Sequence, residues 1–162
     1  MATCFLSLGS NLGDRNAMLS FAEEELTIYG TIINKSSIYT TEPWGYESQH
    51  SFLNKVIQYE TTIPPQVLLS IFKTLEQRAG RLQHVENEYQ DRLLDIDLLL
   101  YDQLIINNET LTLPHPKMYL RKFVLVPLTE IAPTLRHPLF SQTMTELLEV
   151  CPDRTSVVRQ KS

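Results

Sequence analysis

The stretch Leu94-Asp95-Ile96-Asp97-Leu98-Leu99-Leu100 decides the fold around it, because its first residues alternate between apolar and acidic side chains. Alternation predicts a strand, since successive side chains of a strand point to opposite faces. Asp95 and Asp97 then share one face, and the apolar residues share the other: Leu94, Ile96, Leu98 and Leu100. Two carboxylates about 7 Å apart on one face repel each other and weaken a strand. The stretch therefore indicates a site for Mg²⁺ or Mn²⁺, with two solvated aspartates at a strand edge as the alternative.

The segments before and after this strand predict an α+β fold. Strands are expected at 5–8, 31–40, 52–62, 94–101 and 104–106, and helices at 14–29, 66–79, 121–131 and 143–150. Two helical faces should point inward, formed by Leu19, Ala22, Leu26 and Tyr29 and by Val67, Leu68, Ile71, Phe72 and Leu75. Strand, helix, two strands, helix and strand is the order of a ferredoxin-like antiparallel sheet sandwich with helices packed on the sheet. The later helices are C-terminal additions.

Size and charge limit the class of protein. With 162 residues, the chain is predicted to form one domain spanning 1–162. The net charge of −5 comes without a basic stripe, and no segment is apolar over the roughly 18 residues that a membrane span needs. We expect a cytoplasmic monomer that binds neither nucleic acid nor a membrane. The two cysteines, Cys4 and Cys151, lack the spacing of metal or redox motifs.

Basic side chains flank the acidic pair in segments predicted as loops or a helix start: Arg81, His84, Arg92, His115 and Arg121. Arginine forks and metal ions facing two carboxylates would form a site for the phosphates of ATP. The alternative is that each arginine is a solvated surface residue.

The third predicted strand places Phe52 and Asn54 on one face. An aromatic ring beside an amide can stack on a flat heterocycle and hydrogen-bond to it, and Phe123 could supply an opposing ring. The alternative is that both phenylalanines are core residues. The segment Gly9-Ser10-Asn11-Leu12-Gly13 lies between a strand and a helix, where it could cradle phosphate. It matches no phosphate-loop pattern, so a capped tight turn is the preferred interpretation.

Six blocks of the sequence resemble one enzyme family: Gly9-Ser10-Asn11-Leu12-Gly13, Thr41-Glu42-Pro43, Phe52-Leu53-Asn54, Gly80-Arg81, Arg92-x-x-Asp95-Ile96-Asp97 and Pro114-His115-Pro116. The family is the hydroxymethyldihydropterin pyrophosphokinases of folate biosynthesis. The blocks follow the order of the family from about Phe5 to Pro133. The arginine and aspartate block followed by the Pro-His block is the most specific part.

The resemblance implies a transferase that moves pyrophosphate from ATP to the hydroxymethyl group of 6-hydroxymethyl-7,8-dihydropterin and releases AMP. It implies that Asp95 and Asp97 hold two Mg²⁺ ions and act in catalysis together with Arg81 and Arg92. The further residues expected at the nucleotide are Glu76, Leu98, His115 and Arg121. The pterin is expected between Phe52 and Phe123, with Asn54 reading its amide edge beside Thr41, Glu42 and Trp44.

The chain departs from the family pattern before Arg92. Many members carry Arg-Trp-Gly-Pro-Arg, whereas this chain reads Glu88-Tyr89-Gln90-Asp91-Arg92, with His84 and Glu86 in a less basic run. The final arginine remains, and Tyr89 is a candidate for the role of the tryptophan. Thr110 and Pro116 also replace residues of some relatives, so contacts to ATP near them are expected to differ.

Two other classes of function compete with this interpretation. Carboxylate pairs on ferredoxin-like sheets also serve nucleotidyl transfer, which would release pyrophosphate from ATP. A non-catalytic ligand-binding module of the same fold is the second, and it would leave Asp95 and Asp97 without a metal to hold.

Overall fold

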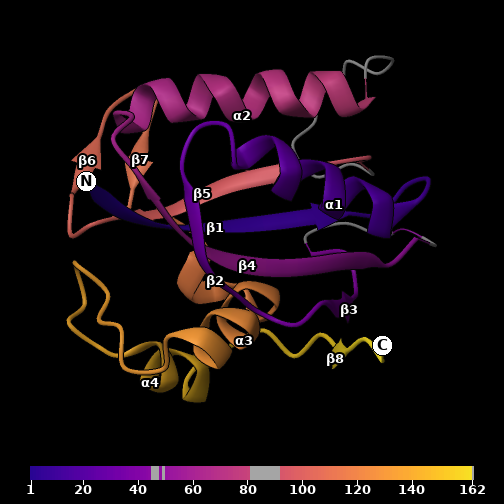
Figure 1. The fold of residues 1–162 in the computed structure, drawn as a ribbon. Coiled ribbons are helices and arrows are strands. Elements are labelled where there is room, and N and C mark those ends of the chain that lie inside the picture. The colour runs from indigo at the N-terminus through magenta and orange to yellow at the C-terminus, as the bar shows by residue number, and fades with distance from the viewer. Residues whose placement is uncertain (45–47, 49, 81–91, 162) are drawn as a thin grey trace.

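An antiparallel sheet runs through the computed structural model, which describes residues 1–44, 48, 50–80 and 92–161 (Figure 1). Its strand order is β5-β1-β4-β3-β8. The bounds are β5 (Asp95–Tyr101), β1 (Ala2–Ser10), β4 (Phe52–Thr61), β3 (Tyr39–Thr41) and β8 (Val157–Arg159). A further strand, β2 (Thr31–Lys35), also pairs with β4. Two short strands, β6 (Ile106–Asn107) and β7 (Thr112–Leu113), form a separate ribbon.

Helices cover both faces of the sheet (Figure 1). On one face lie α1 (Arg15–Leu26) and α2 (Pro65–Gly80), and on the other lie η1 (Met118–Leu120), α3 (Lys122–Ile131) and α4 (Met144–Glu149). Each face has its own buried cluster, with Leu6 and Phe72 in the first and Phe5 and Leu125 in the second. The α+β prediction of a ferredoxin-like antiparallel sandwich with C-terminal additions is confirmed. Within the described part of the chain, no helix is both long and apolar enough to cross a bilayer.

The capped turn predicted at the start of α1 is present. Gly13 has a φ of +66°, a conformation that glycine adopts without strain, and Asp14 caps the helix by accepting the N–H of Ala17 at 3.0 Å. The helix ends at Leu26, so the prediction that it continues to Tyr29 is wrong. Turns follow at 27–29, and Gly30 then packs so closely on β4 that an added Cβ would lie 2.4 Å from the Glu60 carbonyl oxygen.

One residue of the predicted inward face of α2 points outward. Leu68, Phe72 and Leu75 are buried, whereas Val67 is 49% exposed. The buried residues are spaced by four and three positions, which centres the buried face on Leu68 and turns Val67 toward water. The prediction that Val67 faces inward is wrong.

A bulge in β5 separates the two aspartates from the end of the strand. Phe5 pairs with Leu100, but the next residue of β1, Leu6, pairs with Leu98, so Leu99 is an extra residue. Leu98 therefore packs under α1 and α2, while Leu99 and Leu100 pack under α3. The prediction that Leu100 shares a face with Leu98 is wrong. Asp95 and Asp97 precede the bulge, and they pair with Gly9 and Ser7 of β1.

Two other strand predictions need correction, and two short strands were missed. The strand expected at 31–40 is split into β2 and β3 at Ser36, which bonds with Val56 both through its backbone N–H and through its hydroxyl, each at 2.9 Å. The short strand expected at 104–106 begins instead at Ile106, where it pairs with β7. Both β7 and β8 were not predicted, because strands of two or three residues carry too little periodicity.

We predict that Tyr59→Phe lowers the free energy of unfolding by about 1 kcal/mol. The buried Tyr59 hydroxyl donates to the carbonyl of Leu26, the last residue of α1, at 2.5 Å, and phenylalanine removes this bond. Urea unfolding measures the change. Tyr119→Phe on the other face serves as the control and should shift the unfolding midpoint less. Equal stability of Tyr59→Phe and the unmodified protein would contradict the assignment of a stabilising role to this bond.

Candidate active site

A cavity of about 350 Å³ opens around the beginning of β5. Residues from both faces of this strand line it, with Asp95 and Asp97 on one face and Ile96 on the other. The sheet beside β5 contributes four more residues: Ser7, Gly9, Phe52 and Asn54. Helix α2 and the segments 41–44 and 115–123 close the remaining sides. The volume is in the range of pockets that bind small organic ligands.

Three carboxyl groups meet in the cavity. Glu76 of α2 accepts the backbone N–H of Ile96 at 2.8 Å. Ile96 is the residue between Asp95 and Asp97, so this bond holds Glu76 beside both aspartates. Burial, and after it the Asp95 carboxylate, raises the pKa of Glu76. Burial, and after it the Asp97 carboxylate, raises the pKa of Asp95. The cavity therefore holds more negative charge than its surroundings stabilise.

This cluster fits a divalent cation that has oxygen ligands. The described residues contain no group of three or more His, Cys, Asp or Glu side chains arranged to enclose a metal by themselves. Mg²⁺ does not need such an enclosure, because it is usually held by one or two carboxylates and completes its shell with water and phosphate oxygens. Asp95 and Asp97 supply that number of carboxylates, and a cation would offset the repulsion that raises the pKa of Asp95.

Two arginines face the aspartates. Arg92 Nη1 lies 3.3 Å from Asp95 Oδ1, and Arg121 Nη1 lies 3.8 Å from Asp97 Oδ2. The Nε of Arg121 is buried and makes no hydrogen bond within the described part of the chain. A buried guanidinium donor without a hydrogen bond is costly, and an anionic ligand would remove that cost.

The backbone of Arg92 is held by the turn after β1. The buried Asn11 accepts the N–H of Arg92 at its Oδ1 at 2.7 Å, and its own backbone N–H donates to the Arg92 carbonyl at 3.0 Å. The sequence indicated a tight turn here but not its contact with Arg92. Through this contact the turn holds the chain in place where it leads from Arg92 to Asp95.

An aromatic and amide pocket adjoins the charged cluster. Asn54 is buried, and its Nδ2 donates to Thr41 Oγ1 at 2.6 Å. Phe52 and Phe123 line the same cavity from β4 and α3. Gly9 permits this arrangement, because an added Cβ would lie 2.5 Å from Asn54 Oδ1.

Arg121 connects the two halves of the cavity. Its guanidinium carbon lies 4.8 Å from the centre of the Trp44 ring and 5.7 Å from the centre of the Phe123 ring. These distances are typical of cation–π contacts. The same side chain therefore contacts the aromatic rings and the Asp97 carboxylate.

The structure brings most of the predicted site residues into one cavity: Thr41, Glu42, Trp44, Phe52, Asn54, Glu76, Arg92, Asp95, Asp97, His115, Arg121 and Phe123. Leu98 lies in the core under α1 and α2 and does not line the cavity, where Ile96 is the neighbouring apolar residue. Arg81, His84 and Tyr89 lie outside the described residues, and their roles stay predictions.

Several residues that line the cavity were not predicted, among them Lys73 and Lys117. Lys73 lies three positions before Glu76 on α2, so helical spacing alone could have indicated it. Lys117 lies 5.9 Å from the centre of the Trp44 ring, a contact between segments far apart in sequence. Only the folded chain reveals such a contact.

Carboxylates and arginines beside an aromatic pocket on this fold are typical of enzymes that transfer phosphoryl groups with the help of a metal. Comparison with known proteins makes the class specific. Residues 5–133 match the family 7,8-dihydro-6-hydroxymethylpterin-pyrophosphokinase (HPPK), and the chain belongs to this family. The enzyme is accordingly a pyrophosphokinase, a transferase of folate biosynthesis. This result replaces the alternatives of a nucleotidyl transferase and a non-catalytic module.

Relatives and solved structures agree with this membership. A 2-amino-4-hydroxy-6-hydroxymethyldihydropteridine pyrophosphokinase of Porphyromonas gingivalis is 46% identical over 141 residues, which cover 85% of this chain and 95% of that protein. The enzyme of the same name from Aquifex aeolicus is 38% identical over 146 residues, 90% of each chain. A crystal structure of Plasmodium falciparum HPPK-DHPS shares the fold, with a TM-score of 0.70 and 18% identity. The match covers 92% of this chain but only 43% of that longer one.

We predict that Gly9→Ala leaves the fold intact but weakens binding of a flat heterocycle at Asn54 by about tenfold or more, the effect of losing one well-placed polar contact. The new methyl group meets the end of the Asn54 side chain, which can rotate away only by giving up its bond to Thr41. Calorimetric titration with 6-hydroxymethylpterin and a melting curve measure the two effects. Unchanged binding with a normal melting temperature would contradict the role given to Asn54.

Proposed function

We propose that the enzyme transfers the pyrophosphoryl group of ATP to the hydroxymethyl oxygen of 6-hydroxymethyl-7,8-dihydropterin and releases AMP. The observation that carries this proposal is the joining, in one cavity, of a carboxylate pair on β5 with an aromatic and amide pocket on β4. The first suits a metal-bound polyphosphate, and the second suits a flat ring with an amide edge. Family membership supports the same pair of substrates.

The pterin occupies the aromatic and amide pocket in this proposal. Phe52 and Phe123 stack on its two faces, and Asn54 hydrogen-bonds to its amide edge. Thr41 holds the Asn54 side chain at 2.6 Å and so fixes its orientation before the substrate arrives. Backbone groups near Thr41, Glu42 and Trp44 complete the recognition. The hydroxymethyl arm then points toward Asp95 and Asp97.

The phosphates of ATP lie against the arginines. Arg92 and Arg121, which pair with Asp95 and Asp97 in the structure, turn to the phosphate oxygens when the nucleotide binds. His115 lines the same cavity, and Arg81 is expected to join it from outside the described residues. Glu76 lines the cavity and is expected near the nucleotide, whereas the buried Leu98 is too deep in the core to contact it.

Asp95 and Asp97 would hold the Mg²⁺ of the reaction, for which two ions are expected. When bound, Mg²⁺ neutralises the phosphate charge and lowers the cost of forming an alkoxide-like nucleophile. The hydroxymethyl oxygen attacks the β-phosphorus of ATP, and the bond from that phosphorus to the oxygen bridging to the α-phosphorus breaks. AMP leaves with that oxygen. The transfer is direct and needs no covalent enzyme intermediate.

We predict that incubation with ATP, Mg²⁺ and 6-hydroxymethyl-7,8-dihydropterin yields AMP only when the pterin is present. Chromatography of the nucleotide products measures this. The appearance of ADP or free pyrophosphate, or the absence of any reaction, would overturn the proposal.

We predict further that Asp97→Ala lowers kcat by about 10²–10³-fold, the usual cost of losing a charge-stabilising group at a reacting centre. The melting temperature should stay within a few degrees of that of the unmodified protein, because Asp97 is partly exposed and its loss relieves repulsion. Glu109→Ala removes an exposed carboxylate elsewhere and serves as the matched control. Full activity of Asp97→Ala would exclude a catalytic role for the pair.

A further inference from the structure

The chain after the region matched by the family contributes a strand beside the cavity. β8 pairs antiparallel with β3, and Thr41 lies opposite Val157. Just beyond these strands, the backbone N–H of Gln160 donates to the Ile38 carbonyl at 2.7 Å. β3 ends at Thr41, where the chain reaches the cavity. By pairing with β3, β8 therefore stabilises the strand that positions Thr41 and Glu42 at the proposed pterin pocket.

The segment before β8 also holds a side chain of the cavity wall directly. The backbone N–H of Ser156 donates to Glu42 Oε1 at 2.7 Å. Glu42 follows Thr41 and lines the cavity. A hydrogen bond to a carboxylate is among the stronger ones in proteins, so this contact limits the movement of the whole 41–44 segment.

A second contact from the same segment supports the part of the cavity wall formed by the start of α3. Arg121 occupies the N-cap position of α3 but makes no side-chain cap bond, and the Lys122 N–H instead donates to Asp153 Oδ2 at 3.0 Å. The other oxygen of Asp153 accepts the N–H and the hydroxyl of Thr155, at 2.9 and 2.7 Å, which fixes the carboxylate. Asp153 therefore caps α3 from outside the helix. Its negative charge is also favourable there, because the N-terminus of a helix carries partial positive charge.

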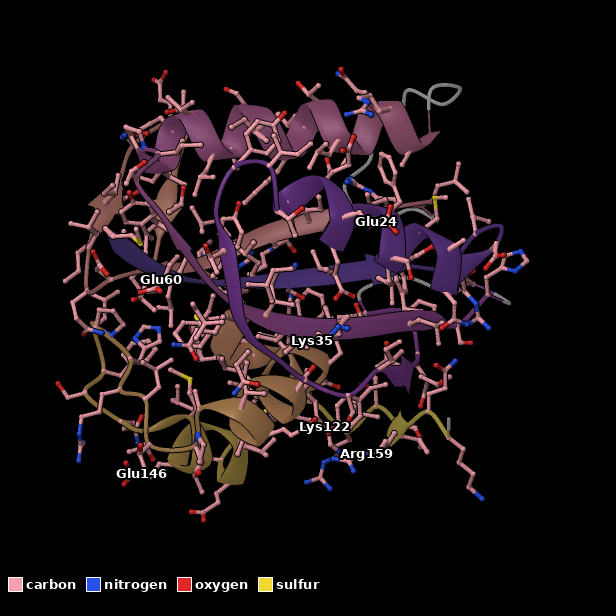
Figure 2. The ribbon with its side chains drawn as sticks, viewed as in Figure 1. Glu24, Lys35, Glu60, Lys122, Glu146 and Arg159 are labelled. Atoms are coloured by element: carbon pink, nitrogen blue, oxygen red, sulfur yellow. The ribbon has the colours of Figure 1, made fainter. Side chains whose placement is uncertain are left out.

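The capped turn of α3 is the part of the helix that reaches the cavity. Lys122 lies between Arg121 and Phe123, both of which line it. Figure 2 shows Lys122 at the start of α3 and Arg159 on β8 in the same part of the molecule. A second link joins β8 to the other end of α3, because Arg159 Nη2 lies 3.3 Å from Oε2 of Glu130, near the last residue of the helix. The hydroxyl of Tyr39, on β3, donates to the same carboxyl group at 2.7 Å.

We propose that residues 153–159 form a strap that sets the spacing between the two walls of the pterin pocket. Asp153 and Ser156 are positioning residues in it, acting through Lys122 and Glu42. The strap's contacts go to Glu42 and to the first turn of α3, beside the proposed pterin pocket, so we expect it to affect the pterin more than the nucleotide. This inference rests on the proposed function, in which the pocket between Phe52 and Phe123 takes the pterin.

Asp153→Ala in the full-length chain tests the strap. We expect the KM for the pterin to rise about fivefold, the size of effect that the loss of one helix cap produces. The KM for ATP and kcat should stay within about twofold, because the nucleotide has further contacts on α2 and at Arg92. Arg154→Ala, which alters the exposed neighbouring residue, is the matched control and should change neither constant. Asp153→Asn keeps one acceptor oxygen and should lose less than alanine.

A binding measurement separates positioning from stability. Trp44 is the only tryptophan of the chain and lines the cavity, so quenching of its fluorescence by 6-hydroxymethylpterin gives a dissociation constant without turnover. Asp153→Ala should raise this constant by about the same factor as the KM. Ser156→Pro, which removes the N–H that Glu42 accepts, should weaken binding in the same direction and gives the test even if Asp153→Ala fails to fold.

Three outcomes would count against the strap or against the proposed function on which it rests. A lower melting temperature with an unchanged pterin KM and dissociation constant would show that the strap is structural only and would overturn the inference. An equal rise of the KM values for both substrates would also overturn it. If the unmodified enzyme neither quenches with the pterin nor forms AMP, the proposed function fails first, and that failure is visible without any variant.

Discussion

Crowding of negative charge around β5 is the constraint on which the site depends. Glu76, Asp95 and Asp97 line one cavity, and burial together with mutual repulsion raises the pKa of Glu76 and of Asp95. A fold selected for stability alone would not keep three carboxyl groups there. Arg92 and Arg121 offset part of the charge in the structure. In the proposed reaction, Mg²⁺ offsets the rest and frees the arginines for the phosphates of ATP.

Much of the fold could be predicted from the sequence, because alternation and helical spacing are local properties of the chain. Two of the failed strand predictions arise where partners distant in sequence decide the outcome. The bulge at Leu99 depends on the register between β5 and β1, so no pattern within β5 indicates that Leu100 changes face. In the same way, Ser36 divides the strand predicted at 31–40 through its bonds to Val56 of β4.

The site residues also differ in whether local sequence patterns indicate them. The aspartate pair was evident from alternation alone, because acidic residues in a strand contradict its usual composition. Alternation placed Phe52 and Asn54 on one face as a candidate site for a flat heterocycle, and the family resemblance made that heterocycle a pterin. No sequence signal indicated Asn11 as the support of Arg92, or Asp153 as the cap of α3, since each acts on a backbone group far away in the chain. Supporting residues of this kind become visible only when the fold places them against the residues they support.

The most direct test of the central claim is a crystal structure with Mn²⁺ in place of Mg²⁺, together with 6-hydroxymethylpterin and an ATP analogue that has a methylene group between the α- and β-phosphorus atoms. We predict anomalous scattering peaks at metal-ligand distance, about 2.1 Å, from carboxylate oxygens of Asp95 and Asp97 and of the analogue's phosphates. Metal bound elsewhere, with both aspartates still paired to Arg92 and Arg121, would contradict the account.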